Sequence, residues 1–462
     1  MREFKVNELI SLKLEDGNTI IQVNGKEFVQ CKGVVLNRTL DELKHISFDW
    51  SIDELADHAE HEGTWDLVSP ETEFLVHCSN LSAWAENNYN SELLHGNLAF
   101  PLLKKLVEEG DETAKRVFKE EIIKRLESGY LPVITYLSEE EYDEYLTREE
   151  WYNAILGHDR QGFREADALI DFEEMMGRKL DLVESMDTEV GYDFRIENRR
   201  VVGISIGGCE LKSIPESIGN LINLKEIHIF DRGIDRIPES IGNLENLEIL
   251  DIPSNKLEIL SDSLTNLENL NKLDLRGNLL KELPKDIGEL SNLECLDLSH
   301  NNLDTLPDSI NQLRDLKFLY LNHNNLTDIS CKLENLYKLE VLNVKFNNIV
   351  DLEPQIKTLV NLKKLYINNN KIRDLSPLID LPKLEELRIY NNNLSCIPEK
   401  IENMRNLRIL DLSENAIKEL PKSIINMGSS LTINLRGNPE FTISDIFLHE
   451  LKEKNIEIYF LD

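Results

Sequence analysis

The sequence predicts an α/β solenoid: a curved parallel sheet of about eleven repeats of 23 residues, preceded by a mixed domain of β-strands and then α-helices. The stretch LNKLDLRGNLLKELPKDIGELSN, residues 270–292, is followed at once by LECLDLSHNNLDTLPDSINQLRD, which has the same apolar spacing. The register continues in both directions in steps of 23 residues, except for one step of 22 between Leu362 and Leu384. Such a fixed period settles the architecture before any local argument.

The physical role of each position follows from the pattern L-x-x-L-x-L-x-x-N-x-L. Leu273 and Leu275 alternate inward on a short strand, and Asn278 lies where the chain bends. Its amide can satisfy buried backbone groups of neighbouring turns. The first two repeats carry Cys209 and Arg232 in place of the asparagine. The predicted asparagine ladder comprises Asn255, Asn278, Asn301, Asn324, Asn347, Asn370, Asn392, Asn415 and Asn438.

The predicted order of the chain has four parts. Residues 1–40 form a β-hairpin-rich segment, and residues 41–190 form a helical domain. Residues 191–440 form the solenoid with an N-terminal β-hairpin cap, and residues 441–462 form its C-terminal cap. Caps are needed because one repeat cannot bury its own leucines, and an open end would also expose a strand edge.

Short-range signals support the N-terminal division. Asp-Gly at 16–17 and Asn-Gly at 24–25 lie between apolar runs, a pattern typical of two-residue hairpin turns. The pattern then becomes helical, with Thr39 and Ser51 as N-caps before amphipathic runs. Residues 93–157 resemble a HEAT-like helical hairpin.

The net charge of −34 argues against two kinds of partner. Nucleic-acid binding needs a basic stripe, and anionic membranes attract basic segments. No Lys or Arg occurs between Lys44 and Lys104, so we expect no nucleic acid and no membrane partner. The acidity serves solubility or, alternatively, presents a surface to a basic partner.

Cysteine usage and the N-terminus indicate the compartment. The cysteines have no paired spacing, and MREFKVNELI lacks an apolar signal core. We therefore expect a reduced, cytoplasmic protein. The cysteines are Cys31, Cys78, Cys209, Cys295, Cys331 and Cys396.

The N-terminal half contains one candidate metal cluster. His58 and His61 lie one helical turn apart and could face the same ion, with His77, Cys78 and His95 nearby in the sequence. The spacing fits no zinc family, and a solvated helix face with a buried thiol explains it equally well. We predict no metal and no cofactor, and keep a metal enzyme in this domain as an alternative hypothesis.

Catalytic motifs are missing from the sequence. It contains no G-x-S-x-G nucleophile elbow and no G-x-x-x-x-G-K-[ST] phosphate loop. Cys295 occupies the third repeat position, where a cysteine is more often a tolerated small residue than a nucleophile. We predict no catalytic residues and a protein that is not an enzyme.

Binding on the concave strand face is the remaining hypothesis. The third, fifth, seventh and eighth repeat positions point to that face, and in repeats six to nine they carry aromatic and basic side chains. Such residues suit an interface hot spot, although aromatics that support one another along the strands are an alternative interpretation. The predicted partner-binding residues are Phe318, Tyr320, Lys345, Phe346, Lys364, Tyr366, Arg388 and Tyr390.

The repeats resemble a known family. The period is that of leucine-rich repeats, and residues 201–440 contain SIPESIGNLINLKEIHI and RIPESIGNLENLEILDI, which look like plant intracellular Ras-group and animal Ras-suppressor-type proteins. NNNKIRDLSPLIDLPKLEELRI looks like the phosphatase-regulator subclass. VNGKEFVQCKGVVLN and the helical region after it resemble uncharacterised archaeal leucine-rich repeat proteins.

The sequence therefore predicts a non-catalytic scaffold that binds a protein partner on the concave face. The resemblance implies, as an alternative, a regulatory subunit or effector of a signalling enzyme such as a small Ras-like GTPase or a protein phosphatase. It does not name the partner.

Overall fold

The computed structural model describes residues 2–28, 70–94, 96–186, 191–209, 211–230, 232–329, 332–428 and 430–460. These residues form two compact units, Met1–Ile155 and Leu156–Asp462, and each is described by itself.

The first unit begins with a four-stranded antiparallel meander. Its strands are β1 (Arg2–Lys5), β2 (Ile10–Glu15), β3 (Asn18–Val23) and β4 (Lys26–Phe28). Both two-residue turns, at 16–17 and 24–25, have left-handed backbone at both positions, which asparagine, aspartate and glycine tolerate best. The two predicted hairpins are therefore confirmed.

Helices complete the first unit. They are α2 (Pro70–Glu86), η1 (Ser91–Leu93), α3 (Gly96–Glu108), α4 (Glu112–Leu126), α5 (Leu131–Glu139), η2 (Tyr142–Tyr145) and α6 (Arg148–Leu156). Helix α2 packs on β2 and β3, and α3 packs on α4. Asp111 caps α4 by accepting hydrogen bonds from the backbone N–H groups of Thr113 and Ala114. The predicted N-caps Thr39 and Ser51 lie outside the described residues.

Helix α7 (Arg160–Met176) belongs to the second unit, because it packs on the first repeat. Its Glu165 is fully buried and accepts a hydrogen bond of 2.9 Å from the backbone N–H of Val201. The boundary defined by contacts, between residues 155 and 156, therefore differs from the predicted one after residue 190. The sequence showed a helix here but not this long-range buried contact.

The second unit contains one long sheet. β5 (Asp181–Leu182) pairs with β6 (Tyr192–Glu197), and β6 forms an antiparallel hairpin with β7 (Arg200–Gly207), as predicted for the N-terminal cap. All further described strands are parallel neighbours in chain order. They are β8 (Glu226–Phe230), β9 (Ile249–Asp251), β10 (Lys272–Asp274), β11 (Cys295–Asp297), β12 (Phe318–Tyr320), β13 (Val341–Asn343), β14 (Lys364–Tyr366), β15 (Glu386–Arg388), β16 (Ile409–Asp411), β17 (Leu431–Asn434) and β18 (Ile456–Tyr459).

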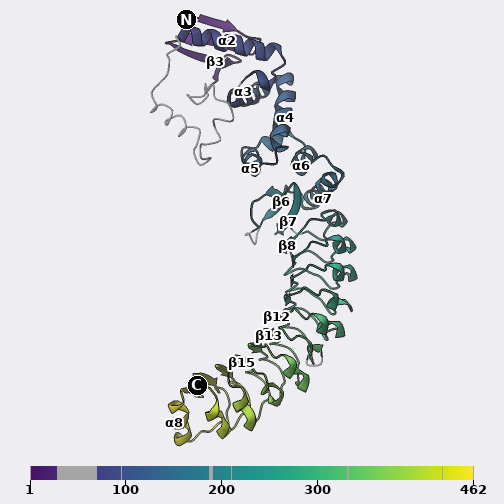
Figure 1. Ribbon diagram of the computed structural model, residues 1–462, viewed down its shortest axis with the longest axis vertical. Helices are drawn as coiled ribbons and strands as arrows, with labels where there is room; N and C mark the ends of the chain where they lie inside the picture. Colours follow the sequence, from purple (N-terminus) through teal and green to yellow (C-terminus); the bar gives the residue numbers. More distant parts are fainter. Residues whose placement is uncertain are drawn as a thin grey trace. The chain divides into compact units, whose positions relative to one another are not determined.

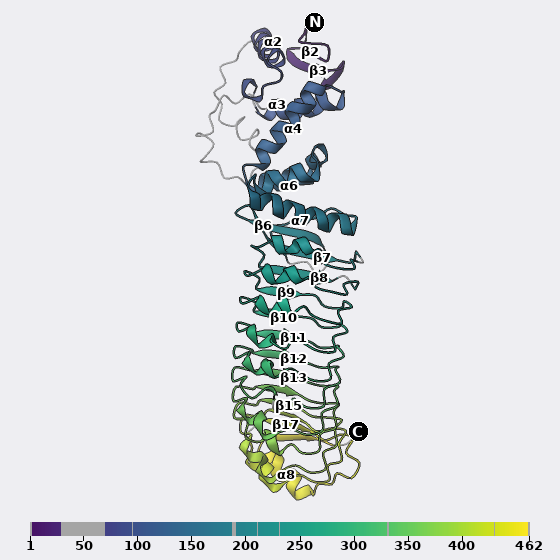
Figure 2. The same cartoon turned by 90° about the vertical axis from the view of Figure 1, so that its right-hand side faces the viewer.

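Short 3-10 turns connect the strands. They lie on the outer side of the curved stack, and the strands lie on its inner side (Figure 1). Turned by 90°, the same strands form successive rungs (Figure 2). The turns are η3 (Glu216–Asn220), η4 (Glu239–Asn243), η5 (Asp262–Asn266), η6 (Ile287–Glu289), η7 (Asp308–Gln312), η9 (Pro354–Thr358), η10 (Ser376–Leu378), η11 (Glu399–Asn403) and η12 (Lys422–Asn426). At the C-terminus, α8 (Asp445–Glu453) packs on β18, the helix and strand predicted for the cap.

Leucines fill the space between strands and turns. Leu270, Leu273, Leu275 and Leu280 of one repeat all have zero exposure. Because neighbouring repeats bury these side chains, the stack has no core apart from the contacts between repeats.

Each asparagine of the ladder joins two repeats. In Asn301, Oδ1 accepts the backbone N–H of Leu280 at 3.0 Å, and Nδ2 donates to the carbonyls of Leu275 at 3.0 Å and Leu298 at 3.1 Å. The same pattern recurs from Asn255 to Asn438. The side chains thereby satisfy backbone groups that the bend would leave buried and unpaired.

A second, exposed asparagine ladder was not found by the sequence reasoning. In each case Nδ2 donates to a backbone carbonyl 24 residues earlier, at distances of 2.6–2.9 Å. Its members are Asn246, Asn269, Asn292, Asn361 and Asn406.

We expect Asn301→Ala to lower the free energy of unfolding by about 3 kcal/mol, because it leaves several buried backbone groups without a partner. The neighbouring Asn302 is exposed, so Asn302→Ala is the matched control and should change stability by less than about 0.5 kcal/mol. Urea denaturation measures both. Equal effects of the two substitutions would show that the buried amide does not hold the repeats together.

Candidate functional site

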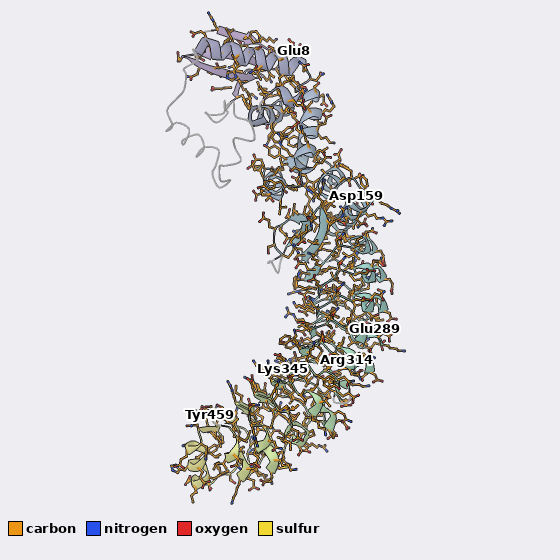
Figure 3. All side chains as sticks on the ribbon, viewed as in Figure 1. Glu8, Asp159, Glu289, Arg314, Lys345 and Tyr459 are labelled. Atoms are coloured by element: carbon orange, nitrogen blue, oxygen red, sulfur yellow. The ribbon has the colours of Figure 1, made fainter. Side chains whose placement is uncertain are left out.

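The inner face is the surface formed by the third, fifth, seventh and eighth positions of the repeats. Figure 3 shows Lys345 on the inner side of the stack, with Glu289 and Arg314 on the outer side. Strand register places equivalent side chains side by side: Phe318 pairs with Val341, and Val341 with Lys364. The inner face is therefore ordered in columns along the stack.

The first part of the inner face carries a network of charges. His228 Nδ1 lies 3.1 Å from Asp251 Oδ2, and His228 Nε2 lies 3.5 Å from Glu226 Oε2. Lys272 Nζ donates to Asp251 Oδ2 at 2.9 Å, and Arg195 donates to Glu226 Oε1 at 2.7 Å. The ionic groups of β6, β8, β9 and β10 are thus linked along the sheet, with the link from β6 to β8 passing over β7.

The two carboxylates next to His228 in this network set its charge. Burial alone would lower the pKa of His228, but the hydrogen bonds and charges of Asp251 and Glu226 outweigh it and raise the pKa to about 9. Burial also opposes ionisation of Asp251, yet His228 and Lys272 keep its pKa below the ordinary value. His228 is therefore a cation at neutral pH.

Strands β10 and β11 also carry titratable groups with raised pKa values. Burial raises the pKa of Asp274 to about 6, against the hydrogen bond from the Arg276 backbone N–H, and the nearby Asp297 adds to the rise. Burial also raises the pKa of the Cys295 thiol to about 11. Because nucleophilic cysteine needs the thiolate form, Cys295 is poorly suited to covalent catalysis.

The predicted partner-binding residues fall into two groups. Tyr366 Oη donates to Glu386 Oε2 at 3.1 Å, and Arg388 Nε donates to Glu386 Oε1 at 2.6 Å. The Arg388 guanidinium lies 5.9 Å from the Tyr366 ring centre. Glu386 was not predicted for the site, yet it holds both side chains in place. The structure thus brings Tyr366 and Arg388 together.

The other predicted residues make fewer contacts within the chain. Phe318, Tyr320 and Tyr390 are partly exposed, and Lys364 is exposed. Lys345 and Lys364 form no ion pair with any of the described residues, although the chain as a whole is strongly acidic. These side chains are free to contact a partner.

A ring ladder runs beside this group and was missed by the sequence reasoning. The rings of His300 and His323 stack with centres 4.1 Å apart, and those of His323 and Phe346 with centres 4.2 Å apart. All three residues occupy the eighth position and have left-handed backbone, with φ of 55°, 57° and 54°. The eighth position could have been found as the residue before each ladder asparagine.

Lys345 lies beside the ring ladder. Burial lowers the pKa of His323, and the nearby His300 and Lys345 lower it further. His323 is therefore a neutral ring at pH 7, suited to stacking. Phe346, which was predicted for the site, has an exposed fraction of 41% at the end of the ladder.

The candidate metal cluster is only partly within the described residues. His58, His61 and His95 lie outside them. His77 and Cys78 lie on α2, where Cys78 is buried. Among the residues that the structure describes, no three potential ligands of the His, Cys, Asp and Glu types gather at one point.

A shallow groove of about 680 Å³ runs along the flank of the first repeats. It is lined by Asn246, Asn269 and Asn292 together with Glu248 and Glu294. The three asparagine amides already donate to backbone carbonyls. The groove is thus a by-product of the second ladder.

Across the described part of the chain, no helix is both long and apolar enough to span a membrane.

Comparison with known families identifies the repeats. Residues 262–376 match a leucine-rich repeat region, residues 360–399 match a pair of leucine-rich repeats, and residues 382–439 match a further leucine-rich repeat model. Residues 262–439 therefore contain leucine-rich repeats, as the sequence pattern predicted for this part of the chain.

Solved structures similar to this chain include bacterial and plant proteins. A leucine-rich repeat protein of Leptospira interrogans is 23% identical, covers 64% of this chain and 98% of its own, and has a TM-score of 0.37. An internalin of Listeria monocytogenes is 22% identical, with coverage of 56% and 80% and a TM-score of 0.45. The plant peptide hormone receptor RGFR1 in complex with RGF2 is 20% identical, with coverage of 62% and 54% and a TM-score of 0.42. No curated protein sequence matches the chain.

We expect the stability that His228 provides to depend on pH. Below about pH 6.5 the histidine is protonated in both the folded and the unfolded chain, so its stabilising contribution is fully present. As the pH rises, the unfolded histidine loses its proton first, and the contribution is lost by the folded-state pKa of about 9. The expected loss is on the order of 2–3 kcal/mol.

The measurement is urea denaturation of the wild type and of His228→Gln between these two pH values. The difference in unfolding free energy between the two proteins should shrink as the pH rises. His300→Gln is the matched control, because His300 is exposed and outside the network. A difference that stays constant for His228→Gln would contradict the charged state of this histidine.

Proposed function

We propose that the chain is a non-catalytic interaction scaffold that binds a protein partner on the inner face at repeats six to nine. The proposal treats the 23-residue units as eleven repeats of one solenoid, from β7 to β17. The proposed contact residues are Phe318, Tyr320, Lys345, Phe346, Lys364, Tyr366, Arg388 and Tyr390.

The observation that carries the proposal is a set of partly or fully exposed aromatic rings on one sheet face, beside lysines that form no ion pair with the described residues. Phe346 has an exposed fraction of 41%, and Lys364 next to Tyr366 is exposed without an ion pair among the described residues. Aromatic and basic side chains are enriched at protein interfaces, where a few of them provide most of the binding energy.

The Tyr366 side chain is already ordered before a partner arrives. Its hydroxyl is bound to Glu386, and Arg388 is held by the same carboxylate. A side chain that is fixed in the free protein loses less conformational entropy on binding. This arrangement favours a rigid contact surface.

Two further parts of the proposal concern setting and partner class. We place the protein in a reducing, cytoplasmic compartment, and Cys78, Cys295 and Cys396 are free thiols. The partner class stays open between a general scaffold partner and a signalling enzyme such as a small GTPase or a phosphatase. Mass spectrometry of proteins captured by the full chain from source lysate distinguishes these classes.

We expect the double substitution Tyr320→Ala and Tyr366→Ala to weaken binding of the captured partner at least about tenfold, because it removes two central rings. Tyr337→Ala is the matched control, because Tyr337 is exposed outside the inner-face positions and its hydroxyl donates to the nearby Asn335 Oδ1 at 2.8 Å. Surface plasmon resonance with the purified partner measures both variants. Unchanged affinity of the double variant would place the binding surface elsewhere.

A further inference from the structure

We propose that the inner face receives an extended segment of the partner that carries a basic and an acidic side chain about four residues apart, with a planar side chain next to the basic one. This inference rests on the proposed function and specifies the chemistry of the partner. Three features support it: the separation of charge along the stack, the ring ladder and the spacing of the strands.

Charge along the inner face is divided between two ends. Asp297 on β11 accepts hydrogen bonds from the backbone N–H and the hydroxyl of Ser299 in its own repeat and forms no ion pair with the described residues. Lys345 and Lys364 lie two and three repeats further along and also form no ion pair with the described residues. Asp297 and the two lysines are too far apart to pair with one another, so each end is open to an opposite charge on a partner. The neighbouring Asp274 does not take part, because it is buried and lies 3.6 Å from the Arg276 guanidinium.

The ring ladder lies between these two ends. Asp297 and His300 are in the same repeat, and so are Lys345 and Phe346. His300 is exposed, and the preceding repeat has Gly277 at the eighth position. No side chain of that position therefore continues the ladder beyond His300, and a planar side chain of the partner can stack there.

The rings share the backbone conformation of the other repeats. The eighth position is also left-handed at Ser254, Asn369, Asn391 and Glu414, and glycine fills it at Gly277 and Gly437. The three rings are therefore distinguished by their side chains and their stacking, and the backbone at these positions suits glycine.

The strand spacing sets the length of the bound segment. Parallel strands lie about 4.8 Å apart, so the three steps from Asp297 to Lys364 span about 14 Å. An extended chain rises about 3.3 Å per residue, which makes this distance about four residues. A nucleic acid fits poorly, because Asp297 would repel its phosphates.

One buried amide adds a contact for the backbone of such a segment. Asn368 occupies the seventh position between Lys345 and Tyr390 and has an exposed fraction of 2%. Its Nδ2 has no hydrogen-bond partner within the described chain. A rotation of this side chain offers the donor to a peptide carbonyl.

The test uses a fluorescein-labelled peptide library and the full-length chain. Each peptide carries an arginine, a tryptophan and a glutamate in either chain order, with the arginine and glutamate about four residues apart and the other positions random. A second library places the two charges side by side. Fluorescence anisotropy should show that the best binders of the first library bind at least about tenfold more tightly than those of the second.

A charge exchange tests the lysine end. The double variant Lys345→Glu and Lys364→Glu should lose at least about tenfold in affinity for the selected peptide and regain it when the peptide glutamate is replaced by lysine. Arg314→Glu is the matched control, since this exposed arginine lies on the outer side (Figure 3). Equal loss in the control would overturn the assignment.

Glycine substitution tests the ring ladder without disturbing the fold. His323→Gly and Phe346→Gly remove rings at positions where the backbone already suits glycine. The thermal unfolding temperature should therefore fall only by the small amount that corresponds to the lost ring stacking. Peptide affinity should nevertheless drop at least about fivefold. Unchanged affinity in folded variants would overturn the role of the ladder.

Failure of this inference differs from failure of the proposed function. If no library peptide binds while the captured partner still depends on Tyr320 and Tyr366, the extended-segment inference is rejected and the scaffold proposal stands. If the affinity of the partner is also unchanged by the two tyrosine substitutions, the inner-face proposal itself is rejected.

Discussion

The buried asparagine amide is the interaction on which the second unit depends. Asn301 connects backbone groups of two consecutive repeats in a place that water cannot reach, and the same geometry recurs along the stack. The leucines supply most of the buried apolar area, but hydrophobic contacts are not directional and do not fix the path of the backbone. The amide fixes where each chain segment bends, and therefore where the next strand starts. Columns of side chains on the inner face exist because this bend recurs in register.

Much of the architecture could be predicted because it follows from the local periodicity of the sequence. Leu273, Leu275 and Asn278 identify strand and bend within a few residues, and the Asp-Gly and Asn-Gly turns identify the hairpins. The boundary of the second unit could not be read in this way. It depends on Glu165, whose partner Val201 is 36 residues away and leaves no local pattern.

The candidate site was predictable only in part, for a related reason. The tyrosines stand out by residue type, whereas His300 and His323 matter through their stacking and their left-handed backbone. Neither property can be seen in hydrophobic spacing. Glu386 was overlooked because a carboxylate in a strand looks like an ordinary polar residue. Its importance follows from bonding to both Tyr366 and Arg388.

The single 22-residue step has a consequence for how such chains change in length. Between β14 and β15 the register still pairs Lys364 with Glu386, and the ladder bond from Ile372 to Asn392 is kept at 2.9 Å. The missing residue is absorbed in the outer turn around η10, where Ser376–Leu378 is shorter than most of its counterparts. Insertions and deletions in the outer turns therefore leave the register of the strands unchanged, and with it the columns of side chains on the inner face. Mutation can therefore vary the outer turns and the inner-face side chains independently.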